Sequence, residues 1–268
     1  MVPIGGNQEN LDRLRGHLEE LGSVLVAFSG GTDSALLVRV AADLLGERAA
    51  ALTALSPTLP EDELAEARAF AKEVGIRHLL LPSREMENPD FVRNPEDRCY
   101  FCKSELFRLC RQEADRLGLR WVLDGTQKDD LGDHRPGLRA AEEEGVRSPF
   151  LELGMGKKEV RGLSRMLGLP TWNKPSMACL SSRFPTGMEI TLERLRRVEE
   201  CERFLREHGF RQIRVRLQNG DARVELSPGE MQRLFESDVR RRFVARCKDL
   251  GFERVTLDLE GYPEREGS

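Results

Sequence analysis

Apolar residues along the first half of the chain switch repeatedly between two spacings. Continuous apolar runs of strand length predict buried strands, and apolar residues that recur every three or four positions predict helices. The predicted strands are 23–29, 49–55, 77–83 and 120–126, and the predicted helices are 8–21, 34–46, 60–75 and 103–118. This alternation predicts an α/β fold, a parallel sheet with helices on both faces. Ligands of such sheets bind at the carboxyl ends of the strands.

The pattern changes after residue 187. A long amphipathic segment predicts a helix, followed by two short strands, helical material and a last strand. These elements are expected at 191–209, 211–217, 222–226, 228–250 and 254–259. The order predicts a small α+β module, so we expect two domains, 1–187 and 188–268. In the first part of the chain, residues 83–98 have no regular pattern and are predicted to form a long irregular loop. Its length and position make this loop a candidate lid over a site.

Composition narrows the class of protein. Apolar residues make up 39% of the chain and charged residues 33%, which is typical of a charge-rich globular protein. No apolar run approaches the ~20 residues of a membrane-spanning helix, and the start of the chain lacks a signal pattern. We therefore expect a cytoplasmic protein without a membrane partner. The net charge of −4 argues against broad nucleic-acid binding.

A glycine-containing turn joins the first strand to the next helix. Its residues are Ser29, Gly30, Gly31, Thr32, Asp33 and Ser34. Glycines let backbone amides approach a ligand closely, and the start of a helix attracts anions. The hydroxyls of Ser29 and Ser34 add donors, and Asp33 is a candidate magnesium ligand. The alternative is an ordinary glycine turn capped by Thr32 or Asp33. The loop lacks the Gly-Lys-Ser/Thr ending of the nucleoside-triphosphatase P-loop.

Ser-Gly-Gly-x-Asp-Ser after a first strand resembles the PP-loop of the ATP pyrophosphatases. That resemblance implies a PP-loop fold that binds the pyrophosphate portion of ATP and cleaves ATP to AMP and pyrophosphate. All of 29–34 would bind the nucleotide, with Asp33 and Ser34 also acting in catalysis. Asp129 and Asp130, after the fourth strand, are further candidates for magnesium; ordinary solvated loop acids are the alternative.

Three of the six cysteines are expected on loops and three inside helices. Cys110, Cys201 and Cys247 fall in helical patterns and are interpreted as packing residues. Four interpretations stay open for the three loop cysteines, Cys99, Cys102 and Cys179. They could form a disulfide, which is rare in the cytosol, or bind a structural zinc with His134 as the fourth ligand. They could also be inert thiols, or hold a [4Fe–4S] cluster with three thiolates and one open iron.

Segments 125–187, 215–226 and 255–262 resemble the LarE family of sulfur transferases. The resemblance implies an ATP-dependent enzyme that adenylates the carboxylates of pyridinium-3,5-biscarboxylic acid mononucleotide and replaces AMP with sulfur. The product would serve the nickel-pincer cofactor of lactate racemase-type enzymes. Some members sacrifice the sulfur of one cysteine at the position of Cys179. Others add a Cys-x-x-Cys pair and hold a [4Fe–4S] cluster. This chain has Cys99, Cys102 and Cys179, so it looks like the cluster type.

The resemblance also implies a pocket of basic residues for the acidic substrate. Arg214 and Arg216 alternate onto one face of a predicted strand, Arg223 lies on its partner, and Arg183 follows Cys179. Surface charge on a half-exposed strand is the alternative. The C-terminal module would then serve substrate binding and oligomerisation. Expected partners are a homo-oligomer, a sulfide donor and other proteins of the cofactor pathway.

Two other functions stay open on the sequence alone. One is a tRNA thiolation enzyme, which also combines a PP-loop with cluster cysteines; the net acidity counts against it. The other is a non-catalytic nucleotide-binding protein with a structural zinc. Zinc without pyrophosphate release would favour that third function.

Overall fold

The computed structural model describes residues 4–132, 136–175, 178–236 and 238–262. Contacts divide the chain into two compact units. The first comprises Met1–Phe91 and Asp97–Met177, and the second comprises Val92–Glu96 and Ala178–Ser268. The predicted domains, 1–187 for the nucleotide and 188–268 for the substrate, stay a prediction; the contacts group residues 178–187 with the second unit.

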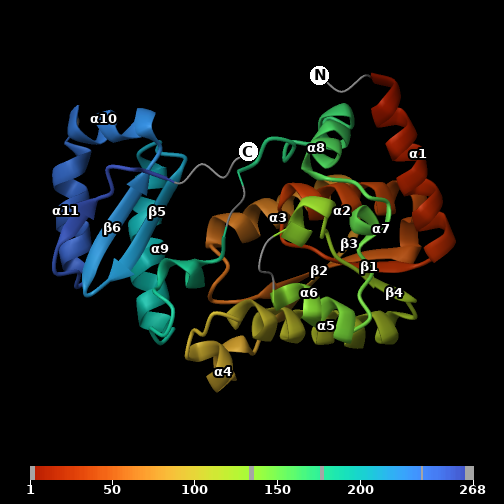
Figure 1. Cartoon of the computed structure of the whole chain (residues 1–268), viewed down its shortest axis with the longest axis horizontal. Coiled ribbons are helices and arrows are strands. Elements are labelled where there is room, and N and C mark those ends of the chain that lie inside the picture. Colours follow the sequence, from red (N-terminus) through yellow and green to blue (C-terminus); the bar gives the residue numbers. More distant parts are fainter. Residues whose placement is uncertain (1–3, 133–135, 176–177, 237, 263–268) are drawn as a thin grey trace. The chain divides into compact units, whose positions relative to one another are not determined.

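The first unit is built on a four-stranded sheet in the order β3-β2-β1-β4. Its strands are β1 (Val24–Ala27), β2 (Ala49–Leu55), β3 (Arg77–Pro82) and β4 (Trp121–Leu123). Each neighbouring pair is parallel. Strand β1 is an inner strand of this order, between β2 and β4 (Figure 1). The loop that follows β1 therefore lies at the carboxyl edge of the sheet, between the ends of two neighbouring strands. The predicted parallel sheet is confirmed.

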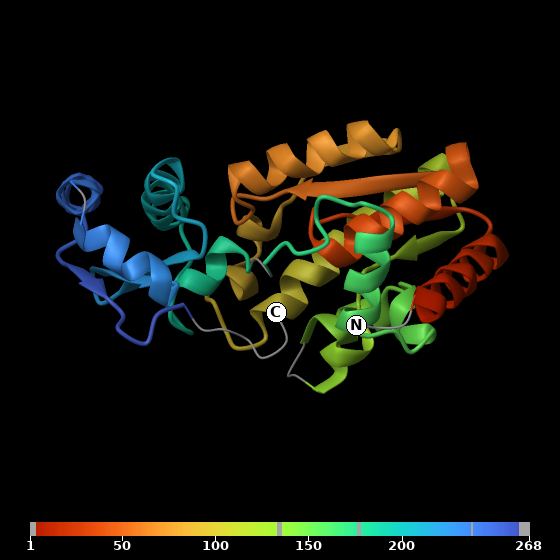
Figure 2. The ribbon, with the colours of Figure 1, turned by 90° about the horizontal axis from the view of Figure 1, so that it is seen from above.

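Helices cover both faces of this sheet, as the sequence predicted (Figures 1 and 2). Val24 and Val26 of β1 join one core, and Leu25 and Ala27 join the other, because successive strand residues point to opposite faces. The first core packs α1 (Ile4–Leu21), α2 (Thr32–Leu45), α3 (Glu61–Val74), α7 (Pro149–Glu152) and α8 (Lys157–Met166). The second packs α5 (Arg98–Leu117) and α6 (Pro136–Glu143).

Helix α5 begins at Arg98, before its predicted start at residue 103. The prediction that Cys99 and Cys102 lie on a loop was therefore wrong, because both lie within the first five residues of α5. Residues 98–102 contain neither glycine nor proline, and their cysteines and aromatics have middling helix propensity. Local pattern therefore gave no sign that the helix had already begun.

The stretch 83–98 is anchored by buried side chains. It contains a 3₁₀ turn (Glu85–Glu87) and a short helix, α4 (Pro89–Val92). Glu85 and Phe91 are almost fully buried, and the Glu85 carboxylate accepts hydrogen bonds from the hydroxyls of Ser56 and Thr58. A segment held at such points does not have the free length that the lid interpretation assumed.

The second unit is a three-stranded sheet with helices, as the predicted α+β module requires. Its strands are β5 (Ile213–Gln218), β6 (Asp221–Leu226) and β7 (Val255–Leu257), and its helices are α9 (Leu192–Glu207), α10 (Pro228–Glu236) and α11 (Val239–Asp249). Strands β5 and β6 are antiparallel, and β6 and β7 are parallel. Asn219 and Gly220 both have positive φ, which suits the two-residue turn of the β5–β6 hairpin.

A five-residue segment from the middle of the chain, Val92–Glu96, belongs to this second unit. The Val92 carbonyl accepts the N–H of Ile190 at 2.8 Å, and the Asn94 carbonyl accepts the N–H of Gly187 at 2.8 Å. The Asn94 side-chain amide donates to the Pro185 carbonyl at 2.8 Å, and Asn94 is fully buried with a φ of 55°. The chain therefore enters the second unit twice.

Candidate functional site

The glycine loop after β1 is closed by its two serines. The hydroxyl oxygens of Ser29 and Ser34 lie 3.1 Å apart, and the N–H of Ser29 donates to the Ser34 hydroxyl at 3.3 Å. Gly30 has a φ of 76°, which only glycine adopts without strain. Helix α2 begins at Thr32, so its first-turn amides have no partner within the helix and its dipole favours an anion there. Loop and helix together have the geometry that an anion site requires, and the binding of a nucleotide by 29–34 stays a prediction.

Two neighbouring segments enclose this loop closely. A Cβ added to Gly30 would lie 3.2 Å from the Ala67 Cβ on α3. A Cβ added to Gly125, just after β4, would lie 3.0 Å from both the Asp33 Cβ and the Ser34 nitrogen. Each distance is too short for an unstrained contact, so glycine permits a backbone approach that other residues would prevent. The glycine loop after β1 therefore lies between α3 and the segment after β4.

A third segment, Thr171–Lys174, is bound to the loop by two hydrogen bonds. The Thr32 hydroxyl donates to the Thr171 carbonyl at 2.7 Å, so this side chain holds the protein's own backbone. The Lys174 ammonium donates to the Gly30 carbonyl at 3.3 Å and forms ion pairs with Glu63 (2.7 Å) and Glu66 (2.6 Å). Sequence reasoning missed Lys174, since a single lysine in an irregular segment 144 positions from Gly30 carries no local signal.

The carboxylates after β4 brace the backbone. Asp129 accepts the N–H of Lys157 at 2.6 Å, at the start of α8, and Asp130 is buried and accepts the N–H of Gln127 at 3.1 Å. Among the residues that the structure describes, no three or more His, Cys, Asp or Glu side chains form a group suited to a metal ion. A magnesium role for Asp33, Asp129 and Asp130 stays a prediction.

Cys99 and Cys102 stand three positions apart within the first five residues of α5, which places them on one helix face. Cys99 is exposed and Cys102 is partly exposed. Between them, Tyr100 donates a hydrogen bond to Glu143 of α6 at 2.6 Å, and the Arg139 guanidinium lies 3.9 Å from the Tyr100 ring centre. These contacts fix the turn against α6. His134, the candidate zinc ligand, lies outside the described residues.

Cys179 belongs to the second unit and immediately precedes a 3₁₀ turn, Leu180–Arg183. The Arg183 guanidinium is 1% exposed and forms a two-point ion pair with Glu202, with distances of 2.8 and 3.0 Å. It also donates to the Ala178 carbonyl at 2.9 Å and to the Cys179 carbonyl at 3.4 Å. Burial alone would lower the pKa of Arg183, but Glu202 outweighs burial and raises it. Arg183 therefore shapes the Cys179 backbone.

Glu202, on α9, is the centre of this arrangement and was missed by sequence reasoning. It is fully buried and accepts hydrogen bonds from the N–H of Val215 at 3.0 Å and from Arg206 at 3.2 Å, besides those from Arg183. One carboxylate thereby joins α9, β5 and the Cys179 turn. Glutamates are frequent on amphipathic helices, and nothing in the local sequence separates this one from its exposed neighbours.

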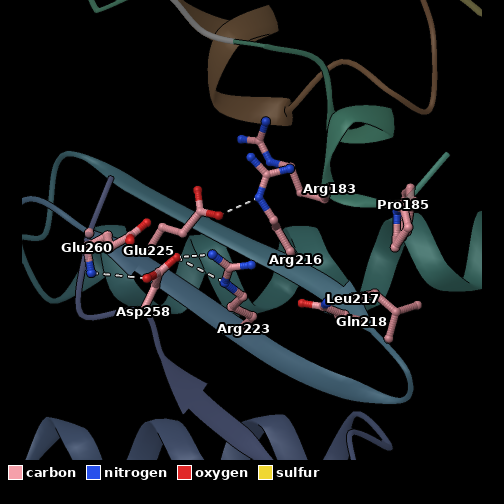
Figure 3. A pocket seen from close by; sticks show the side chains of 11 residues that line it. Arg183, Pro185, Arg216, Leu217, Gln218, Arg223, Glu225, Asp258 and Glu260 are labelled. Carbon is pink, nitrogen blue, oxygen red and sulfur yellow. Dashed lines mark hydrogen bonds and ion pairs between the residues drawn. The ribbon is translucent and has the colours of Figure 1, made fainter. Parts of the chain in front are cut away.

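Three of the four predicted arginines, Arg183, Arg216 and Arg223, line a pocket of about 490 Å³ within the second unit (Figure 3). Arg216 lies opposite Arg223 in the β5–β6 ladder, and Arg214 lies opposite Glu225, so the expected common face is confirmed. Arg216 pairs with Glu225 at 2.5 Å, and Arg223 pairs with Asp258. The lining residues are Arg183, Phe184, Pro185, Arg216, Leu217, Gln218, Arg223, Glu225, Asp258, Glu260 and Gly261.

Arg214 is held beside this pocket by its neighbours. Its guanidinium donates to the Tyr262 hydroxyl at 3.2 Å and lies 3.5 Å from the Glu225 carboxylate. Burial lowers the pKa of Arg214 from its ordinary value, and the nearby Arg183 and Arg216 add to the effect. Two of the four predicted arginines, Arg216 and Arg223, thus present partly exposed guanidiniums to the pocket.

The remaining cysteines behave as predicted. Cys110, Cys201 and Cys247 are fully buried, and all six cysteines are thiols rather than disulfides. Burial raises the pKa of the Cys110 thiol to about 12, which makes it unreactive. No helix in the described part of the chain combines the length and apolar character needed to cross a bilayer.

Known proteins resemble this chain along most of its length. The family model for asparagine synthase matches residues 12–132. The pyridinium-3,5-bisthiocarboxylic acid mononucleotide synthase of Lactiplantibacillus plantarum is 36% identical over 91% of this chain and 88% of its own length. Uncharacterized proteins of Synechocystis sp. and Methanocaldococcus jannaschii are 49% and 32% identical, each over 95% of this chain and over 95% and 97% of their own lengths.

Proposed function

Because the chain belongs to the LarE family of ATP-dependent sulfur transferases, we propose that it converts pyridinium-3,5-biscarboxylic acid mononucleotide into thiocarboxylates. These would enter the nickel-pincer cofactor of lactate racemase-type enzymes. The observation that carries the proposal is the 36% identity to a synthase of the bisthiocarboxylic acid product, across 91% of the chain. The geometry of the glycine loop and of the arginine pocket supports it.

The first step activates a carboxylate, which is a poor electrophile because attack adds charge to an anion. A carboxylate oxygen attacks the α-phosphorus of ATP, the bond to the β-phosphate bridge breaks, and an acyl-adenylate and pyrophosphate result. The glycine loop and the start of α2 stabilise the departing pyrophosphate. Magnesium would add charge neutralisation, and Asp33 is the residue that we assign to hold it, because its carboxylate stands in the first turn of α2, directly after the glycine loop.

The pocket of the second unit matches the charges of the proposed substrate. Arg216 and Arg223 suit its phosphate and carboxylates, which are anionic. Glu225, Asp258 and Glu260 line the same pocket and suit the positive charge of its pyridinium ring. A pocket with both signs of charge selects a molecule that carries both, and disfavours a simple polyanion such as free phosphate.

The second step replaces AMP with sulfur. Cys99, Cys102 and Cys179 are the residues that we assign to a [4Fe–4S] cluster; the chemistry of three free thiols with some exposure supports this assignment. When bound, such a cluster would hold an added sulfide for attack on the activated carbon. Without it, the Cys179 sulfur would attack the acyl carbon, AMP would leave, and β-elimination would transfer the sulfur and leave dehydroalanine.

The test is anaerobic turnover with ATP, magnesium, sulfide and the pyridinium dicarboxylate mononucleotide. We expect one AMP and one pyrophosphate for each thiocarboxylate, with the product identified by mass. Cys179→Ser should keep substrate-dependent pyrophosphate release and lose sulfur transfer, because adenylation precedes the sulfur step. Pyrophosphate release that requires tRNA, or none with either substrate, would contradict the proposal.

Iron content separates the two sulfur sources. Cluster use predicts about four irons per chain, repeated turnover, and loss of both in Cys99→Ser. Sacrifice of Cys179 predicts a single turnover, no iron, and a protein lighter by hydrogen sulfide. Cys110→Ser is the matched control, since Cys110 is buried in the same helix as the pair.

A further inference from the structure

Lys174 stands at the glycine loop with its charge almost withdrawn from solvent. Its side chain is 13% exposed, and that of its partner Glu63 is 12% exposed. Burial alone would lower the pKa of Lys174, but the hydrogen bonds to Glu63 and Glu66 outweigh burial and raise it. Lys174 is therefore a cation throughout the neutral range.

Its two partners create an electrostatic difficulty at an anion site. Glu63 and Glu66 lie on α3, and the same helix approaches Gly30 so closely that the Glu63 carbonyl would be 3.5 Å from an added Cβ. Two carboxylates beside the loop oppose the binding of a phosphate anion. Lys174 is the cation that both of them contact, so its charge offsets theirs at the loop.

Lys174 also fixes the loop itself. Its ammonium caps the Gly30 carbonyl, in the residue whose φ is positive, while Thr32 binds the Thr171 carbonyl three residues earlier in the same segment. The two hydrogen bonds run in opposite directions between the loop and Thr171–Lys174. Rotation of the Gly30 peptide would break the hydrogen bond from the Lys174 ammonium to the Gly30 carbonyl.

We propose that Lys174 is a positioning residue for the pyrophosphate portion of ATP: it masks Glu63 and Glu66 and holds the Gly30 peptide in the anion-receptive conformation. This inference rests on the proposed use of the loop for ATP. It concerns binding, so it does not depend on which sulfur source or which acceptor the enzyme uses.

The experiment is calorimetric titration of the whole protein with magnesium pyrophosphate at low and high salt. Lys174→Met should weaken binding at least tenfold, and Lys174→Arg should stay within about threefold, because an arginine keeps the charge that masks the glutamates. The double variant Glu63→Gln/Glu66→Gln should bind at least threefold more tightly than the wild type. Adding both glutamine changes to Lys174→Met should restore most of the lost affinity.

Lys72→Met is the matched control, since it removes an exposed lysine from the last turn of α3 and should leave binding unchanged. Thermal unfolding checks that each variant is folded. Unchanged affinity in Lys174→Met overturns the inference. The inference is also overturned if the triple variant, Lys174→Met with both glutamine changes, binds pyrophosphate as weakly as Lys174→Met alone. That result would mean that the ammonium binds the phosphate directly. A purely structural role does not produce the tighter binding expected of the double glutamine variant.

The two proposals fail separately. Wild-type protein that binds pyrophosphate with the expected variant pattern, yet releases none with the pyridinium substrate, refutes the proposed function alone. Wild-type turnover with an unaffected Lys174→Met refutes the positioning role alone.

Discussion

At the residue scale, Glu202 shows how one buried carboxylate organises the backbone of a cysteine that it does not touch. It binds Arg183 at two points, and Arg183 in turn holds the carbonyls of Ala178 and Cys179. The Cys179 turn therefore depends on a pair of charges that are 1% and 0% exposed. Removing one partner of such a pair leaves the other charged and unsolvated.

We expect Glu202→Ala to lower the free energy of unfolding by about 3–5 kcal/mol, because Arg183 would be left buried without its counter-charge. Glu207→Gln, on the same helix, is the control; its side chain is 64% exposed and should change stability by less than about 0.5 kcal/mol. Urea denaturation of the three proteins measures both values. Equal stability of the two variants would show that the ion pair does not hold this turn.

Residues whose role follows from local sequence were predictable, and residues whose role follows from tertiary contact were not. Ser29, Gly30 and Ser34 lie within six positions, so their spacing alone indicates an anion site. Lys174 acts on Gly30 from 144 positions away, and Glu202 acts on Arg183 from 19. The substrate role of Arg183 stays a prediction, and its ion pair with Glu202 could not be predicted, because the sequence shows the charge of Arg183 and not its partner.

At the scale of elements, α7 is held by a carboxylate at its end. Glu152 accepts hydrogen bonds from Arg147 at 2.8 and 2.5 Å and from the N–H of Ser148 at 3.0 Å. The hydrogen bonds from Arg147 lower the pKa of Glu152 below its ordinary value. The charged carboxylate thus closes the turn that enters α7.

Glu152→Gln should cost about 1 kcal/mol of unfolding free energy at pH 7, and the difference should vanish in acid. The sign follows from the lowered pKa: stabilisation is complete above the unfolded value of about 4.3 and disappears as pH falls through the folded value. Thermal unfolding of the wild type and of Glu152→Gln between pH 7 and pH 3 measures this difference in stability. A difference that persists at pH 3 would indicate a packing effect instead of a charge effect.

Elements with strong periodicity were placed well by the sequence. Strand 49–55 is β2 at the same bounds, and helix 60–75 differs from α3 by one residue at each end. The predicted strand 120–126 shortens to Trp121–Leu123, and the chain after it passes the glycine loop, where Gly125 approaches Asp33 and Ser34. Helix α5 was predicted to start late, and that error moved Cys99 and Cys102 from a helix turn to a loop.

At the scale of the whole molecule, the segment Val92–Glu96 was unpredictable. The sequence indicates two parts in succession, with a change of pattern near residue 187. It gives no sign that five residues from the middle of the chain complete the second unit, because their partners, at Pro185, Gly187 and Ile190, are about 90 positions away. Asn94 is the point of attachment that can be tested.

Asn94→Gly should destabilise the protein by about 1 kcal/mol and Asn94→Ala by about 2 kcal/mol. Both variants lose the hydrogen bond to Pro185, but only alanine also opposes the φ of 55°. Hydrogen exchange at the Gly187 and Ile190 amides, which the segment protects, should rise in both. Equal exchange in wild type and variants would mean that the segment contributes nothing to the second unit.

The same segment determines how the protein can be divided for reconstitution. A cut between residues 177 and 178 looks like a separation of two parts, yet the C-terminal fragment then lacks the Val92–Glu96 piece of its own fold. That fragment presents the Gly187 and Ile190 amides without acceptors, and the N-terminal fragment carries the carbonyls that satisfy them. The halves are therefore complementary, and a split reporter or a semisynthetic ligation made at this position would have its docking element already built in.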